Sequence, residues 1–173
     1  MNIKKQARIS LLLALSVVLS IVEGMVPIFN GFIPGLKIGL ANIAVLFVLY
    51  KYSFKDAFIL TILRVFLVAI LRTGLFSITF SFSLVGAFLS ILIMGISKKF
   101  TKLSIIGIST LGSISHTIGQ LIVASIFLES NKIFYYFPFL LVISTITGIV
   151  IGIISHQLYS RIEKIDKNNW FTY

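Results

Sequence analysis

Several basic and amide side chains in this very apolar chain have the chemistry to bind an anion. Lys37 and Asn42 lie in the stretch GLKIGLANIAVLF, and Arg64 and Arg72 lie about two turns apart in a later apolar run. A guanidinium in hydrocarbon costs at least a few kcal/mol, so Arg64 should face a protein interior, water or a partner. Together the four side chains could hold an anionic or phosphorylated solute. Two alternatives stay open: Lys37 extends its ammonium to lipid headgroups, and Arg64 pairs with Glu23.

A second polar group follows one face of an apolar stretch near residues 105–128. Its members recur at three- and four-residue steps, and they are Ser109, Gly112, Ser113, His116 and Gln120. Residues at this spacing share one face of a helix. We predict that His116 or Gln120 contacts a ligand, while close helix packing is the alternative. A lone histidine without nearby carboxylates does not indicate a metal site.

Small residues also follow each other near the N-terminus, where Ala7, Ser10 and Ala14 are three and four positions apart. In lipid, a stripe of small residues lets two helices approach closely, because shape complementarity replaces the hydrophobic driving force. The stripe could pack against the chain's own helices or dock another membrane subunit. We take docking as the prediction.

Catalytic chemistry has little support in this chain. Enzymes that join isoprenyl diphosphates use clustered aspartates and Mg²⁺, whereas the only aspartates here are Asp56 and Asp166 among five acidic residues. No Gly-rich phosphate loop, catalytic triad or paired intramembrane carboxylate appears in the sequence. We therefore expect neither an enzyme nor an ATPase, and no cofactor.

The elements that must position these side chains are transmembrane helices. The chain has 173 residues, 58% of them hydrophobic and 12% charged, with a mean hydropathy of +1.08. A span needs about 20 apolar residues. We therefore predict an all-α, polytopic membrane protein, with residues 1–173 forming a single six-helix bundle. The expected helices cover residues 7–25, 34–50, 54–72, 78–96, 105–128 and 135–159, and the first is a retained helix rather than a signal peptide.

The distribution of basic residues predicts the orientation of the bundle. In the six-helix arrangement, 11 basic residues fall on the side of both termini, three on the other, and Arg64 lies inside a helix, which accounts for all 15. By the positive-inside rule, both termini are expected in the cytoplasm and the protein in the cell membrane. The net charge of +10 then serves orientation and contact with anionic lipid, and we expect no nucleic-acid partner.

Five stretches between about residues 8 and 154 resemble the Gx transporter family, whose members often carry the label heptaprenyl diphosphate synthase component I. They are GLKIGLANIAVLFVLY, ILRVFL, FSFSLVGAFLSILIM, SHTIGQLIVA and YYFPFLLVISTITGIVIG. That family is similar to the S components of energy-coupling factor (ECF) transporters. S components are six-helix proteins that bind a vitamin or other micronutrient from the outer side, under a loop between helices 1 and 2.

The resemblance implies partners as well as a fold. S components contact a transmembrane coupling subunit through an AxxxA pattern on helix 1, and two ATPase subunits supply the energy. Here Ser10 and Ala14 make SxxxA, and Val18 replaces the next small residue. The predicted function is a substrate-binding subunit for a small solute, which could be anionic or related to isoprenoids, quinones or flavins. The alternative is a noncatalytic membrane subunit or scaffold in isoprenoid or quinone metabolism.

Overall fold

The computed structural model describes residues 3–25, 39–129 and 131–168, and these residues are almost entirely helical. The α-helices are α1 (Ile3–Met25), α2 (Asn42–Lys51), α3 (Phe54–Val68), α4 (Ile78–Phe100), α5 (Ile105–Phe127) and α6 (Phe137–Asn168). A π-helical turn, η1 (Ala69–Thr73), continues α3, and a 3-10 segment, η2 (Asn131–Tyr136), precedes α6. The prediction of an all-helical chain is confirmed for the described residues.

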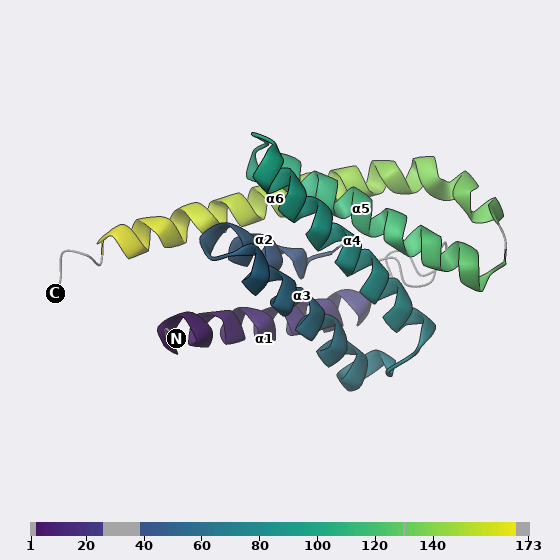
Figure 1. The fold of residues 1–173 in the computed structure, drawn as a ribbon, viewed down its shortest axis with the longest axis horizontal. Helices are drawn as coiled ribbons and strands as arrows, with labels where there is room; N and C mark the ends of the chain where they lie inside the picture. The colour runs from purple at the N-terminus through teal and green to yellow at the C-terminus, as the bar shows by residue number, and fades with distance from the viewer. Residues whose placement is uncertain (1–2, 26–38, 130, 169–173) are drawn as a thin grey trace.

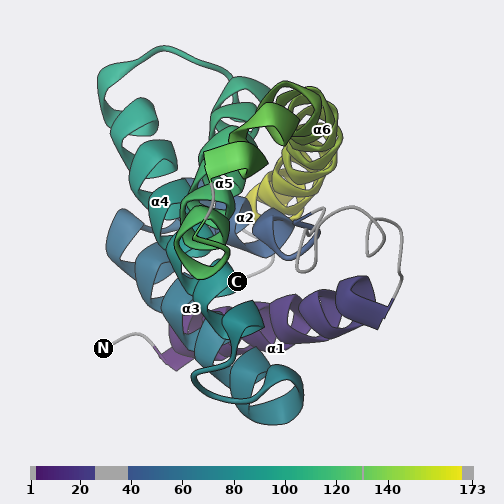
Figure 2. The same cartoon turned by 90° about the vertical axis from the view of Figure 1, so that its right-hand side faces the viewer.

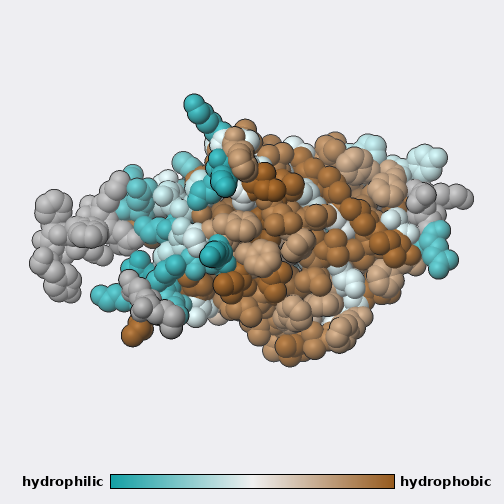
Figure 3. Space-filling model, viewed as in Figure 1, coloured by the Kyte–Doolittle hydropathy of each residue, from teal (hydrophilic) through white to brown (hydrophobic). Residues whose placement is uncertain are grey.

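Both the start of α1 and the end of α6 lie at one end of the bundle (Figure 1). The connections from α2 to α3 and from α4 to α5 lie toward the same end, and with them the lysines and arginines that the sequence analysis grouped on one side. We call this the basic end, and the opposite end the far end. The space-filling view shows a broad apolar surface between polar residues at the basic end and a smaller polar group at the far end (Figure 3).

Four of the helices are long and apolar enough to cross a membrane: Ile3–Met25, Ile78–Phe100, Ile105–Phe127 and Ile133–Lys164. Their outward side chains are largely Leu, Ile, Val and Phe, as expected for surfaces that face lipid. Helix α3 alone is shorter, but η1 continues it to Thr73. Together α3 and η1 cover the predicted range 54–72.

The sequence prediction is wrong for the second helix. Residues 34–50 were expected as a span, but α2 begins only at Asn42, after a turn at residues 39–41, and residues 34–38 lie outside the described part. Gly39 has a positive φ of 90°, a conformation that helical residues do not adopt. Ten residues extend about 15 Å, which is half of the hydrocarbon thickness. Helix α2 therefore begins near the middle of the bundle.

Helix α2 lies inside the bundle rather than on its surface. It packs against α1, α3 and α6, and in the view along the bundle it is seen between them (Figure 2). Val45, Leu46, Val48 and Leu49 are at most 1% exposed, and they form the main hydrophobic core with residues of α3, α4, α5 and α6. This enclosure explains why a helix too short to span a bilayer is stable here.

Glycines bring the backbones of α4, α5 and α6 close together. A Cβ added at Gly119 of α5 would lie 2.9 Å from the Cα of Gly86 in α4, closer than real side chains approach. In the same way, a Cβ at Gly148 of α6 would lie 2.6 Å from the Cα of Thr110. Close approach through small residues is typical of helix packing in membranes.

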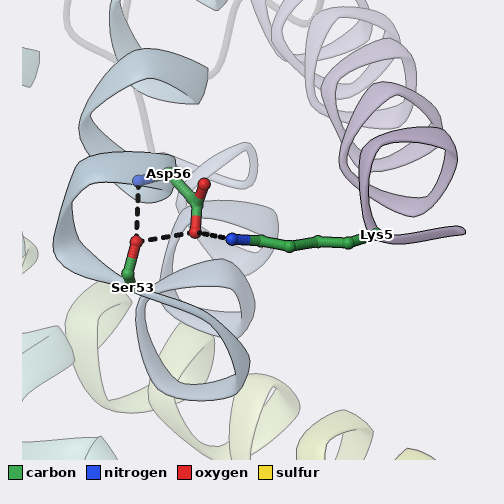
Figure 4. Close-up of polar contacts among 3 residues, drawn as sticks. All are labelled: Lys5, Ser53 and Asp56. Carbon is green, nitrogen blue, oxygen red and sulfur yellow. Dashed lines mark hydrogen bonds and ion pairs between the residues drawn. The ribbon is translucent and has the colours of Figure 1, made fainter. Parts of the chain in front are cut away.

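Local polar contacts define where α3 begins and connect it to α1 at the basic end (Figure 4). The hydroxyl of Ser53, the N-cap residue, accepts a hydrogen bond from the backbone N–H of Asp56 at 3.2 Å. The Asp56 carboxylate accepts a hydrogen bond from Ser53 at 2.6 Å and pairs with the Lys5 ammonium at 2.7 Å. One of the two aspartates in the chain thus has a structural role, connecting α1 to the helix that carries Arg64.

Candidate functional site

A small cavity of about 30 Å³ lies among α1, α2, α3, α4 and α5, between the middle of the bundle and the far end. It has room for about two water molecules. Polar and charged side chains supply much of its wall, which is unusual for the interior of an apolar bundle. The lining residues are Ser20, Glu23, Gly39, Ala41, Asn42, Arg64, Val65, Val68, Ser83 and His116.

Arg64 is the most informative residue in this wall. Its side chain is 5% exposed, because it lies on the face of α3 that also buries Ala57, Leu60 and Thr61. The guanidinium donates a hydrogen bond from Nη1 to Oδ1 of Asn42, the first residue of α2, at 3.3 Å. Of the three surroundings expected for Arg64, which are the protein interior, water or a partner, the structure shows the protein interior.

Glu23 supplies negative charge on the other side of the cavity. It lines the same small cavity as Arg64, so the two side chains bring opposite charges to one wall. The same carboxylate accepts hydrogen bonds from the backbone N–H groups of Gly39 and of Leu40, the latter at 3.2 Å. Glu23 thus connects the end of α1 to the turn that precedes α2. The sequence alternative for Glu23 was a pairing with Arg64, and the structure places both residues in the wall of one cavity.

His116 and Gln120 lie one turn apart on α5, and both are buried. The His116 ring lies against Gly86 of α4, where a Cβ would be 3.0 Å from its Cε1 atom, and it also lines the cavity. Gln120 is not among the lining residues. The small members of the predicted stripe, Gly112 and Ser113, pack against α4 and α6. The stripe therefore combines close helix packing with one cavity residue.

Arg72 and Lys37 do not join this group in the structure. Arg72 lies in η1, is exposed, and donates a hydrogen bond from Nη2 to the backbone carbonyl of Gly24 at the end of α1. It does not line the cavity. Lys37 lies outside the described residues. Of the six side chains named as candidate ligand residues, Asn42, Arg64 and His116 line the cavity together.

Two serines of the cavity wall, Ser20 and Ser83, were not predicted from the sequence. A signal for Ser20 is nevertheless present, because Ser16, Ser20 and Glu23 recur at steps of four and three residues, and all three are buried. This spacing marks the inward face of α1. For Ser83 we find no comparable signal, because serines and phenylalanines alternate over residues 80–83.

The stripe of small residues on α1 points away from the bundle. Ala7, Ser10 and Ala14 are exposed, whereas the buried residues of this helix are Leu12, Ser16, Val17, Ser20 and Glu23. Packing against the chain's own helices, one of the two interpretations of the stripe, is therefore not observed for the described residues. This face is left to lipid or to another subunit.

Comparison with known proteins agrees with the motifs found in the sequence. The family model described as heptaprenyl diphosphate synthase component I matches residues 12–158, which include all of α2 to α5 and most of α1. No curated protein and no solved structure matches the chain. On the strength of this match across most of its length, the chain belongs to the heptaprenyl diphosphate synthase component I family, the Gx transporter family indicated by its sequence motifs.

Proposed function

We propose that this protein is the solute-binding membrane subunit of an uptake transporter, similar to the S components of ECF transporters. The observation that carries the proposal is the buried guanidinium of Arg64 at a polar cavity inside an apolar bundle. An ionisable residue in the interior of a membrane protein costs free energy, and such residues commonly mark substrate or ion sites. Here Arg64 stands with an amide, an imidazole and a carboxylate in one cavity wall.

The short helix α2 adds to the suitability of this site. It ends at Lys51 near the basic end and is only ten residues long, so its N-terminus points into the bundle beside the cavity. The N-terminus of a helix carries a partial positive charge. In α2 the N–H groups of Asn42 and Ile43 donate to the carbonyls of Gly39 and Leu40, so it is the partial charge that acts on a ligand. Half-helices that end near the bilayer midplane form binding sites in many transporters. The α2 N-terminus and Arg64 together favour a ligand with an anionic or strongly polar group.

The charge balance of the cavity restricts how such a ligand enters. Glu23 already opposes the charge of Arg64 and occupies the N–H groups of Gly39 and Leu40. An anionic ligand must therefore compete with the Glu23 carboxylate. A cavity of about 30 Å³ is also far smaller than sites for organic ligands, which measure about 300–1,000 Å³. Capture thus requires separation of α1 from the start of α2, with loss of the Glu23 contacts.

The outward face of α1 is the proposed docking surface for a coupling subunit. Helix α1 lies at one side of the bundle and packs against α2 and α3 (Figure 2), which leaves Ala7, Ser10 and Ala14 exposed. Because the sequence has no ATP-binding loop, transport energy must come from partners, which we propose are a transmembrane coupling subunit and two ATPase subunits. The cavity would then open toward the outer side, with the basic end in the cytoplasm.

The family description favours a second candidate function. Heptaprenyl diphosphate synthase component I names one component of a synthase, so the chain could be a noncatalytic membrane subunit or scaffold in isoprenoid or quinone metabolism. Such a subunit would bind a soluble prenyl synthase rather than ATPases. The buried cavity has no evident part in that role.

Co-purification in mild detergent distinguishes the two functions. Recovery of a coupling subunit with two ATPases is the result expected for a transporter, and native mass spectrometry of the same preparation should show a retained small molecule. Recovery of a soluble prenyl synthase alone, with an empty cavity, would overturn the transporter proposal and support the scaffold.

A further inference from the structure

A larger cleft, separate from the Arg64 cavity, opens at the basic end of the molecule. It has a volume of about 520 Å³ and lies where the end of α2, the start of α3 and the end of α4 meet. Its wall is mostly apolar, and two lysines stand in it. The residues that carry the argument are Phe54, Leu92, Ile96, Lys98, Lys99 and Phe100. Among the described residues that line the cleft, none is acidic.

The two ammonium groups are held in different ways. Lys98 donates a hydrogen bond from Nζ to the backbone carbonyl of Leu49 at 2.6 Å, and its Nζ lies 4.7 Å from the ring centre of Tyr50. Lys99 is exposed, with its Nζ 5.2 Å from the ring centre of Phe100. An ammonium has three N–H donors. Lys98 is thus fixed at the end of α2 while retaining donors for a further oxygen ligand.

The apolar wall lies beside these charges and is open at the surface. Phe54 is 41%, Ile96 52% and Phe100 73% exposed, so large apolar side chains face outward next to the lysines. Gly95 gives the wall its depth, because a Cβ there would overlap the Phe54 ring at 2.3 Å. Apolar surface with cations at one edge matches an amphiphile that has a hydrocarbon chain and an anionic head.

We infer that this cleft binds one anionic phospholipid from the leaflet at the basic end. An acyl chain lies along Phe54, Leu92 and Ile96, and the phosphate group contacts Lys98 and Lys99. A volume of about 520 Å³ falls within the range of defined ligand sites. Basic pockets between transmembrane helices are known to bind anionic headgroups. The contact from Lys98 to Leu49 places this lipid against the end of α2, the helix whose other end borders the Arg64 cavity.

The test uses the full chain in nanodiscs of phosphatidylcholine alone or of equal phosphatidylcholine and phosphatidylglycerol. Native mass spectrometry should show one phosphatidylglycerol retained by the wild type in preference to phosphatidylcholine. Lys99→Gln, at an exposed position, should weaken this retention about fivefold, as expected for the loss of one lysine near anionic lipid. Lys102→Gln is the matched control, because Lys102 is exposed in the same region and does not line the cleft.

A second pair of variants tests the acyl-chain part of the site. Ile96→Trp should fill the cleft and reduce phosphatidylglycerol retention, whereas Ile93→Trp, on an exposed part of α4 outside the cleft, should not. Both positions are exposed, so both variants should fold. Equal retention in the wild type, Lys99→Gln and Ile96→Trp would overturn the proposal. Displacement of the lipid by inorganic phosphate, which has no acyl chain, would also overturn the proposal. The same holds if farnesyl diphosphate displaces the lipid at a lower concentration than phosphatidylglycerol requires.

Discussion

Arg64 of α3 donates a hydrogen bond to Asn42, the residue at which α2 begins inside the bundle, over 3.3 Å. This contact joins the one buried arginine described in the structure to the N-terminus of a helix that is too short to span a bilayer. Both groups are positive, and Glu23 is the carboxylate that opposes them. The balance of these charges supplies the first two predictions.

Replacing Arg64 with leucine should weaken capture of an anionic solute by at least about tenfold, because a desolvated charged partner is lost. The loss in free energy of unfolding should be smaller than the roughly 3–5 kcal/mol that breaking a buried ion pair costs. Glu23 keeps its hydrogen bonds from two backbone N–H groups, so its charge stays partly compensated. The measurements are solute retention by native mass spectrometry and thermal unfolding. Arg72→Leu is the matched control. Equal loss of binding in both variants would contradict a site centred on the cavity.

Replacing Glu23 with glutamine should have the opposite effect on an anionic solute. The cavity then loses the negative charge that competes with the ligand, and affinity should rise several-fold. The amide oxygen can still accept one backbone hydrogen bond, so the weaker cap costs about 1 kcal/mol. Arg64 also loses its opposing charge while it stays buried, so the total loss of stability should reach about 3–5 kcal/mol. Isothermal titration with the molecule retained by the wild type measures the change. Weaker binding of that molecule would indicate that Glu23 contacts the ligand and that the ligand is not an anion.

The glycine contact between α4 and α5 makes a prediction about stability. Gly119→Ala should destabilise the protein by about 1–3 kcal/mol, because the new methyl would meet backbone atoms of Gly86 at 2.9 Å. Gly107→Ala on the same helix is the control. There the methyl would be 3.4 Å from Leu103, an ordinary contact, and alanine favours the helix. Thermal unfolding in one detergent compares the two, and a stable Gly119→Ala protein would show that the two helices are not closely packed.

The helices could be predicted because transmembrane segments must satisfy their own backbone hydrogen bonds over a set length of apolar residues. The error at α2 has a specific cause. Its start depends on contacts from Glu23 to Gly39 and Leu40, across 16 and 17 positions, which no local pattern of apolar residues reveals. Sequence reasoning extended the helix to residue 34 because the apolar run continues there.

The candidate site could be predicted in part for a related reason. That Arg64 avoids lipid follows from the cost of a charge in hydrocarbon, and its burial in the protein agrees with this expectation. Arg72 was expected beside it, but η1 intervenes, and its wider i→i+5 turn changes the direction of the residues that follow. A π-helical turn has no clear signature in this stretch. Its position therefore had to come from the structure, as did the contact from Arg72 to the Gly24 carbonyl.

The last prediction concerns the outward stripe of α1. Ala14 is exposed, so Ala14→Leu should change stability by no more than about 0.5 kcal/mol. A docked partner helix, however, must approach the backbone at this position, and a leucine would hold it away. The cavity wall begins at Ser20, six residues or about 9 Å further along α1 and on its buried face, so solute binding in detergent should survive. We expect the variant to bind solute, yet fail to co-purify with a coupling subunit or to support uptake.

Val142→Phe, which adds bulk to an exposed position of α6, should leave co-purification and uptake intact. Unchanged uptake with Ala14→Leu would place the docking surface elsewhere and remove the main mechanical support for the transporter proposal.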